Sequence, residues 1–135
     1  MKSKCFAIHE LIPKAIFEKK GEKAWIYIPD RHIKVLDKLK EHFNLGTMTI
    51  NNYFWGGDRE WSAGRTPDSP WYSLTSLHSL FQAYDIEFSH YSAQEVRNYI
   101  LENLHEFKEI GGMELGVSWV HLDFRNVDRI VLFRK

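Results

Sequence analysis

The sequence predicts an α+β fold in which helices flank a mostly antiparallel sheet. Three observations support this expectation: segments with apolar residues at helical spacing, short segments that alternate apolar and polar residues, and the order of the two kinds. Helices come first, and a strand, a long loop, a second strand, a further helix and a final run of strands follow. Such an order is typical of α+β domains. The 135 residues are the length of one domain, so we expect a single domain over residues 1–135.

Two helices are expected in the first third of the chain. Pro13 suits the first turn of a short helix that runs to about Lys20, with Gly21 ending it. Asp30 is a plausible N-cap for the next helix, near residues 31–43, where apolar residues recur at helical spacing with Lys and Glu between them. Between the two helices, residues 25–28 form a short apolar segment, which favours an extended conformation.

A third helix is expected after Ser92, which begins a capping box with Glu95. Gly111 and Gly112 follow this helix and break it. Apolar residues recur on one face of the predicted helix, as they do on a helix that packs against a core. These residues are Val96, Tyr99, Ile100, Leu104 and Phe107.

Strands are expected on both sides of the third helix. Residues 47–50 alternate polar and apolar side chains, and residues 83–88 form a second strand after a long loop over residues 55–72. That loop is rich in Gly, Pro and Asp, and long loops in compact domains are often functional. Two or three strands finish the chain, at about residues 113–117, 118–125 and 128–134.

The composition excludes several classes of partner. Lys plus Arg number 18 and Asp plus Glu number 18, so no basic excess points to nucleic acid or to anionic lipid. No stretch approaches the roughly 20 apolar residues that span a bilayer, and the N-terminal residues lack the apolar run of a signal peptide. The single cysteine, Cys5, allows no intramolecular disulfide and no Cys-rich zinc site. We therefore expect a soluble monomer, cytoplasmic as synthesised, that binds neither nucleic acid nor membrane.

Two stretches of the chain place histidine and carboxylate side chains among apolar residues. In SLHSLFQAYDIEF, His78 precedes Asp85, and in SWVHLDFR, His121 precedes Asp123. Because side chains alternate faces along a strand, Asp85 and His121 each lie on the face opposite their apolar neighbours. If the two strands are neighbours, both side chains point into one cleft, and a turn before the second strand can aim His78 at the same point.

This combination of side chains suits a zinc ion. Two imidazoles and one carboxylate leave a fourth position open, which is the arrangement of catalytic rather than structural zinc sites. Zinc lowers the pKa of water towards about 7 and polarises a carbonyl. The spacing alone leaves a second interpretation open, because a single histidine is commonly a hydrogen-bonded core or loop residue. His78, Asp85 and His121 are therefore candidate Zn²⁺ ligands.

The same two stretches resemble paired motifs of a known family. Ser76, His78, Ala83 and Asp85 match the S-x-H-x-x-G-x-A-x-D signature of the zinc D-alanyl-D-alanine carboxypeptidases, which belong to the hedgehog-like peptidase superfamily. Residues 119–123, Trp-Val-His-Leu-Asp, resemble the second motif of that family, whose histidine is the third zinc ligand.

The likeness covers roughly residues 10–127 and points to phage-type members. Residues 49–52, the glycine pair Gly56-Gly57 and the loop Ser62-Ala-Gly-Arg65 resemble a strand, a glycine pair and a loop of those members. The resemblance implies a hedgehog/D,D-peptidase-like fold and a zinc-dependent peptidase. Its substrate would be the stem peptides of peptidoglycan, cleaved as by a D,D-carboxypeptidase or an endolysin-like endopeptidase. A phage-encoded protein of this kind would act on the host cell wall.

Two positions depart from the family pattern. The glycine of the first motif is Phe81 here, which leaves the nearby backbone free to differ. Many family enzymes carry the general base three residues before the third ligand, where this chain has Ser118, whose hydroxyl is no useful base. Glu114, seven residues before His121, is the expected substitute. The alternative for Glu114 is a solvated acid on a strand edge.

Two further residues receive roles from the resemblance and from their chemistry. The resemblance implies that Arg65 contacts substrate, and its guanidinium suits a carboxylate or a polarised carbonyl. Pairing with Asp58 or Asp68 is the alternative for this arginine. Asp123 shares the strand face of His121 and is expected to orient that histidine, not to bind the metal itself.

The remaining histidines and tryptophans carry weaker signals. The histidines expected to be solvated on helices are His32, His42 and His105. The tryptophans of the long loop either wall a cleft or anchor the loop in the core, and they are Trp55, Trp61 and Trp71. The serine at position 118 also leaves a second function open, that of a catalytically weak or inactive zinc-stabilised binding or virion-structural module of the same fold.

Overall fold

The computed structural model describes all residues from 1 to 135 and has the α+β architecture that the sequence predicts. Five strands form one sheet in the order β1-β2-β4-β3-β5. Their bounds are Met48–Thr49 (β1), Ala83–Phe88 (β2), Gly112–Glu114 (β3), Val120–Asp123 (β4) and Val131–Phe133 (β5). Three of the four strand pairs are antiparallel, but β5 runs parallel to β3, so the sheet is mixed.

The parallel pair arises from the path of the chain after β4. The strands β3 and β4 form an antiparallel pair, and the chain then reverses again and returns on the far side of β3. A strand that is antiparallel to β4 and lies beside β3 must run parallel to β3. The backbone carbonyls of Gly111 and Phe133 both accept ladder hydrogen bonds in this pair, from Val131 and Leu115 respectively.

The chain forms three α-helices: α1 at Lys14–Lys20, α2 at Asp30–His42 and α3 at Ala93–Glu102. Gly21 ends α1 with a positive φ of 51°, and the Ser92 hydroxyl accepts a hydrogen bond from the Glu95 amide at the start of α3, both as predicted. None of the helices has both the length and the apolar character needed to cross a bilayer.

Two local predictions for the N-terminal part are wrong. Residues Gly21–Tyr27 form a 3₁₀ helix, although an extended segment was expected at 25–28. No strand lies beside this segment, so its backbone satisfies its hydrogen bonds locally, as between the Ile28 amide and the Trp25 carbonyl at 3.1 Å. Asp30 is the first residue of α2 and Pro29 is its N-cap, which places the aspartate charge in the first turn next to the positive end of the helix.

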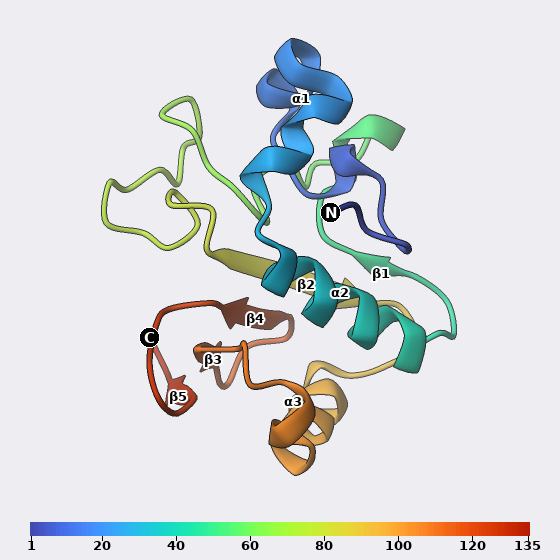
Figure 1. The fold of residues 1–135 in the computed structure, drawn as a ribbon, viewed down its shortest axis with the longest axis vertical. Helices are drawn as coiled ribbons and strands as arrows, with labels where there is room; N and C mark the ends of the chain where they lie inside the picture. Colours follow the sequence, from blue (N-terminus) through green and yellow to red (C-terminus); the bar gives the residue numbers. More distant parts are fainter.

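The hydrophobic core fills one face of the sheet. Figure 1 shows α2 lying across the sheet, with α3 below it and α1 at the far end of the molecule. The apolar residues of β2 and β4 alternate with polar ones, and the apolar set meets the buried stripe of α2. The fully buried side chains in this layer include Ile33, Leu36, Leu39, Tyr84, Ile86 and Leu122.

His32 belongs to this core, contrary to the prediction that it is solvated. Its Nδ1 lies 2.8 Å from the Tyr84 hydroxyl, and its ring stacks on Phe124 with centroids 4.0 Å apart. Burial lowers the pKa of His32 to about 3, so the ring is neutral and behaves as an aromatic core side chain. His42 and His105 are exposed, as predicted.

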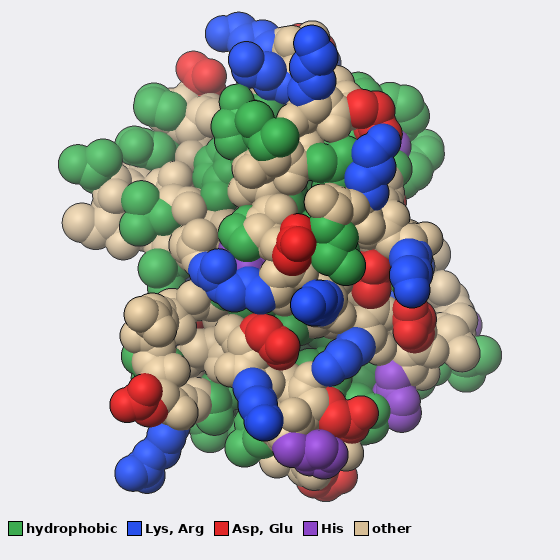
Figure 2. Space-filling model, in the orientation of Figure 1, with side chains coloured by type: hydrophobic (Ala, Val, Ile, Leu, Met, Phe, Trp, Pro, Cys, Tyr) green, Lys and Arg blue, Asp and Glu red, His purple; other side chains and the backbone are tan.

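The other face of the sheet carries the polar residues of β2 and β4. No helix or strand lies between Trp55 and Ala83, so an irregular segment over residues 56–82, longer than the predicted loop 55–72, runs beside this face. It is the green-to-yellow loop in Figure 1. Figure 2 shows acidic and basic side chains intermixed over much of the visible surface, in keeping with the zero net charge.

The alternation of faces along β2 predicts that substitutions at two neighbouring residues lower the stability by very different amounts. Ile86→Ala removes a side chain that is 0% exposed, and we expect it to lower the free energy of unfolding by about 2–5 kcal/mol. Glu87→Ala removes an exposed side chain that is ion-paired with Arg59, and we expect a change below about 1 kcal/mol. Urea denaturation of both variants measures this difference, and equal losses would contradict the observed register.

Candidate metal centre

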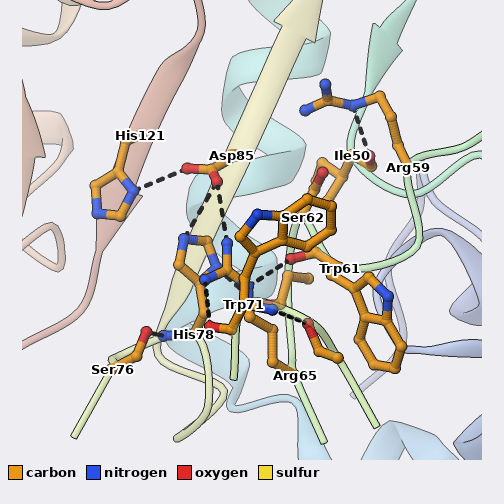
Figure 3. Close-up of polar contacts among 12 residues, drawn as sticks. Ile50, Arg59, Trp61, Ser62, Arg65, Trp71, Ser76, His78, Asp85 and His121 are labelled. Carbon is orange, nitrogen blue, oxygen red and sulfur yellow. Dashed lines mark hydrogen bonds and ion pairs between the residues drawn. The ribbon is translucent and has the colours of Figure 1, made fainter. Parts of the chain in front are cut away.

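Three side chains from separate segments converge on the polar face of the sheet. Asp85 on β2 and His121 on β4 are direct partners across an antiparallel strand pair, and His78 comes from the irregular segment that leads into β2. One ligand atom of each residue lies within 4.8 Å of a ligand atom of the other two. Figure 3 shows the Asp85 carboxylate between the two imidazoles. The structure thus brings together all three residues that the sequence predicts as metal ligands.

His78 is held by the loop in one tautomer. Its Nδ1 lies 2.9 Å from the backbone carbonyl of Ala63, and because a carbonyl only accepts hydrogen bonds, Nδ1 carries the proton. Nε2 is therefore the ring nitrogen that faces the cluster, and it lies 3.3 Å from Oδ2 of Asp85. The His78 carbonyl accepts hydrogen bonds from the amides of Arg65 and Phe81, which ties the two loop segments together.

Phe81, in the turn after His78, combines a strained backbone with close packing of its ring. It is the one non-glycine residue with a positive φ, at 59°, a conformation that costs about 1–2 kcal/mol for a residue with a side chain. Glycine adopts this conformation without strain, and glycine is the residue of the resembling motif at this position. The ring of Phe81 covers Gly64 so closely that a Cβ there would lie 2.7 Å from a ring atom. This packing holds the turn despite the strain.

His121 is held on both of its ring nitrogens. Nδ1 lies 2.8 Å from Oδ1 of Asp85, and Nε2 lies 3.5 Å from Oδ2 of Asp123. Asp123 is fully buried, and the guanidinium of Arg125 binds both of its oxygens, at 2.7 and 2.6 Å. Asp123 thus faces the far side of the imidazole, which is the geometry of a carboxylate that orients a metal-binding histidine.

The side chains of Asp85, His121 and Asp123 form a row, and all three have shifted pKa values. Burial would raise the pKa of Asp85, but its close contacts with His121 and His78 outweigh that effect and hold the pKa well below its usual range. Burial would lower the pKa of His121, yet its contacts with Asp123 and Asp85 raise it to about 9. Burial would also raise the pKa of Asp123, while His121 and Arg125 lower it to about 2. The metal-free site therefore holds a proton on His121 between two carboxylates, where a divalent cation can replace it.

The donor set fits zinc. Two neutral imidazole nitrogens and one carboxylate oxygen are zinc ligands, and tetrahedral zinc separates its donors by about 3.3 Å. The Asp85 oxygens already lie 3.3 and 2.8 Å from the nearer nitrogens of His78 and His121, so small side-chain movements suffice. The other nitrogen of each ring has its own acceptor, as metal-binding histidines require.

Arg65 lies beside the cluster but is largely occupied by backbone groups. Its Nε donates to the Trp61 carbonyl at 3.1 Å and its Nη1 to the Trp71 carbonyl at 3.5 Å. Its Nη2 lies 3.8 Å from Oδ2 of Asp85, and Figure 3 shows the guanidinium between these groups. Burial lowers the pKa of Arg65, an effect that Asp85 opposes. Arg65 therefore pairs with neither Asp58 nor Asp68, the alternative expected from the sequence.

Glu114 is buried in the interior of the sheet. Met113 pairs with Leu122 across β3 and β4, so Glu114, one residue further along β3, lies on the face that carries His121. The strand β3 lies between β4 and β5, and Glu114 is only 4% exposed, which contradicts a solvated acid on a strand edge. Its carboxylate has no ion-pair partner. Ser118 is exposed in the connection between β3 and β4.

A cleft of about 340 Å³ opens beside Asp85. Its apolar walls are Trp61, Trp71 and Trp119, whereas Trp55 lies outside it. From the sequence, it was open whether the loop tryptophans wall a cleft. Trp119 was not among the predicted wall residues, although it shares the strand face of His121. Polar groups complete the lining: Asp58, Arg59, Ser62, Arg65 and Asp85.

Some positioning groups were missed in the sequence. The Ala63 carbonyl that orients His78 is a backbone atom and leaves no signal in the residue type. Asn51 is buried, and its side chain accepts a hydrogen bond from the Ser62 amide at 3.2 Å and donates to the Ile12 carbonyl, which fixes the start of the loop segment. Arg125 follows Asp123 by two residues in the sequence, and that spacing on one strand face was an available clue.

No family model, curated protein or solved structure matches this chain.

Zinc content should depend on each of the three converging residues. His78→Ala, Asp85→Ala and His121→Ala each remove one donor, so we expect purified variants to lose most of the roughly stoichiometric zinc of the wild type. His105→Ala is the matched control, because this histidine is exposed and outside the cluster. Atomic absorption measures the ratio of zinc to protein. Full zinc in any of the three variants would remove that residue from the set of ligands.

The raised pKa of His121 predicts two opposite pH trends. Its folded pKa of about 9 exceeds the unfolded value of about 6.5, so its contribution to the stability of metal-free protein is complete below about pH 6.5 and is lost as the pH rises through 9. Zinc competes with the same proton, so zinc affinity should rise over that interval.

Denaturation of chelator-treated protein and zinc titration, both between pH 6 and 9.5, test these trends. His121→Gln should lose both of them. A zinc affinity that is independent of pH in the wild type would show that no proton is displaced from His121.

Proposed function

We propose that this protein is a zinc-dependent peptidase that hydrolyses a peptide bond in the stem peptides of bacterial cell walls, as a D,D-carboxypeptidase or endopeptidase. The observation that carries the proposal is the convergence of His78, Asp85 and His121 beside an open cleft. Three protein donors leave one position for a reactant, which separates this set from closed four-ligand structural sites. The substrate class follows from the resemblance of the two motifs to the zinc D-alanyl-D-alanine carboxypeptidases.

The ligand residues and their supports prepare the site. Bound zinc would supply a Lewis acid that polarises a carbonyl and lowers the pKa of water to about 7. His78 and His121 are held as ligands by the Ala63 carbonyl and by Asp123, so little rearrangement is needed on binding. Arg65 gives the cleft its shape through the Trp61 and Trp71 carbonyls, and its Nη2 remains for a substrate carbonyl or carboxylate.

Glu114 is the proposed general base, and it then returns the proton to the leaving amine. It lies on the face of His121, it is buried, and no cation neutralises it. Asp123 is a poorer base, because Arg125 binds both of its oxygens. Glu87 is paired with Arg59 at 3.0 Å and is exposed.

A second candidate function is a zinc-stabilised binding or virion-structural module with little or no activity. The observation in its favour is Ser118, which is exposed at the position where the resembling enzymes carry an acid. Both candidates share the zinc site, so zinc binding does not separate them, whereas hydrolysis of wall peptides does. A phage origin and action on a host cell wall suit either candidate.

Replacing Glu114 tests the peptidase proposal. Glu114→Gln preserves the side-chain shape and removes the basicity, so we expect full zinc content and a turnover reduced by about 10²- to 10⁴-fold on purified wall peptides. Glu87→Gln is the control and should retain its turnover. Asp123→Asn should weaken zinc binding about 10- to 100-fold, with turnover largely restored by excess zinc.

Unchanged turnover in Glu114→Gln would exclude Glu114 as the base. A loss in Asp123→Asn that persists at full zinc occupancy would assign the base to Asp123. A wild-type protein that holds zinc and cleaves no wall peptide would favour the binding or structural module.

A further inference from the structure

The cleft beside Asp85 has apolar walls of one residue type. All of its apolar lining comes from tryptophan, namely Trp61, Trp71 and Trp119. Trp71 is 64% exposed, so its indole adds little to the core and is accessible to a ligand. The volume of about 340 Å³ falls in the range of small-molecule sites, about 300–1,000 Å³. We call this feature the tryptophan cleft.

Arginine side chains hold the backbone of each tryptophan in place. Arg65 donates to the carbonyls of Trp61 and Trp71, and the buried Arg97 donates to the carbonyl of Trp119 at 3.1 Å. The three tryptophans come from separate positions in the chain. In each case a hydrogen bond from an arginine holds the backbone carbonyl. A ring that enters the cleft therefore meets side chains whose backbone is already in place, which lowers the entropy cost of binding.

The charges around the tryptophan cleft balance. Two basic residues, Arg59 and Arg65, face two acids, Asp58 and Asp85. Arg59 is also paired with Glu87 at 3.0 Å, and Arg65 lies 3.8 Å from Asp85. A strongly charged ligand gains little from such a balanced site. An uncharged ligand with many hydrogen-bonding groups can use both the donors and the acceptors of the rim.

We infer that the tryptophan cleft binds a sugar ring of the glycan strand to which the stem peptide is attached. A pyranose has an apolar C–H face that stacks on an indole, and its hydroxyl and acetamido groups suit Asp58, Arg59 and Ser62. An aromatic side chain would also stack, but it would leave these polar groups unpaired. A nucleic acid would need a basic excess, which the chain lacks.

This inference rests on the proposed action on cell-wall peptides and adds a specificity to it. Because the cleft includes Asp85, a sugar bound there places the glycan-proximal end of the attached peptide close to the metal-binding cluster. The protein should therefore prefer peptides that are still linked to glycan over the same peptides released from it. Trp71 is then a specificity-determining residue.

The test uses two tryptophans with equal exposure. Trp71 in the cleft and Trp55 outside it are both 64% exposed, so Trp55→Ala is a matched control for Trp71→Ala. The binding probe is a soluble β-1,4-linked N-acetylhexosamine tetramer, titrated by calorimetry with and without a zinc chelator. We expect Trp71→Ala to weaken tetramer binding about tenfold, Trp55→Ala to leave it unchanged, and Trp71→Tyr to retain most of it.

A second measurement compares turnover of a glycan-linked peptide with that of the same free peptide. Trp71→Ala should reduce turnover of the linked peptide more than turnover of the free peptide, so the wild-type preference for the linked peptide should fall about tenfold. Circular dichroism verifies that the variants are folded.

Each outcome bears separately on the two proposals. Absence of tetramer binding at millimolar concentration, an equal loss in Trp55→Ala, or equal losses on both peptides in Trp71→Ala would overturn the sugar site. Tetramer binding that depends on Trp71, in a protein that cleaves no wall peptide, would keep the sugar site and remove the peptidase function. Cleavage without tetramer binding would do the reverse.

Discussion

The contact between Asp85 and His121 is the interaction on which the polar face of the sheet depends. It joins direct partners on β2 and β4, with Nδ1 of His121 2.8 Å from the carboxylate. A carboxylate in such a partly buried place is costly unless every charge nearby has a partner. Asp85 has His78 as its second partner, His121 has Asp123, and Asp123 has Arg125. The strand register places these groups in one row, so a slip by one residue would move the row into the core.

The two faces of the sheet divide the tasks of stability and chemistry. The face against α2 and α3 is apolar and holds the fold, and even its one histidine, His32, is neutral there. The opposite face carries the cluster, beside an irregular segment over residues 56–82 that has no ladder of its own. That segment depends on specific polar contacts: the Asp85 amide with the Ser62 carbonyl, His78 with Ala63, and Arg65 with two tryptophan carbonyls. A rigid sheet that positions a loop in this way is a common basis for binding and catalysis.

The sequence revealed much of what depends on local pattern, although the 3₁₀ helix at Gly21–Tyr27 was missed. The capping box at Ser92 and the alternation along β2 and β4 predicted a helix and two strand faces. Those faces bring Asp85 and His121 together only because the two strands are neighbours, which the structure shows. Contacts between distant segments left no such pattern. The parallel pairing of β5, the burial of His32 under Tyr84 and Phe124, and the Ala63 carbonyl behind His78 all depend on how separate parts of the chain meet. The same is true of Arg65, whose partners are backbone carbonyls and not the nearby acids.

The coordination of one bound zinc ion tests the central claim most directly. Zinc K-edge X-ray absorption of protein loaded with one equivalent of metal should show two imidazole nitrogens at about 2.0–2.1 Å, one or two further oxygens and no sulfur. In His121→Ala one imidazole should disappear, and in His105→Ala the spectrum should match the wild type. A sulfur ligand from Cys5, a shell of six oxygens, or two imidazoles that persist in His121→Ala would contradict a centre built from His78, Asp85 and His121.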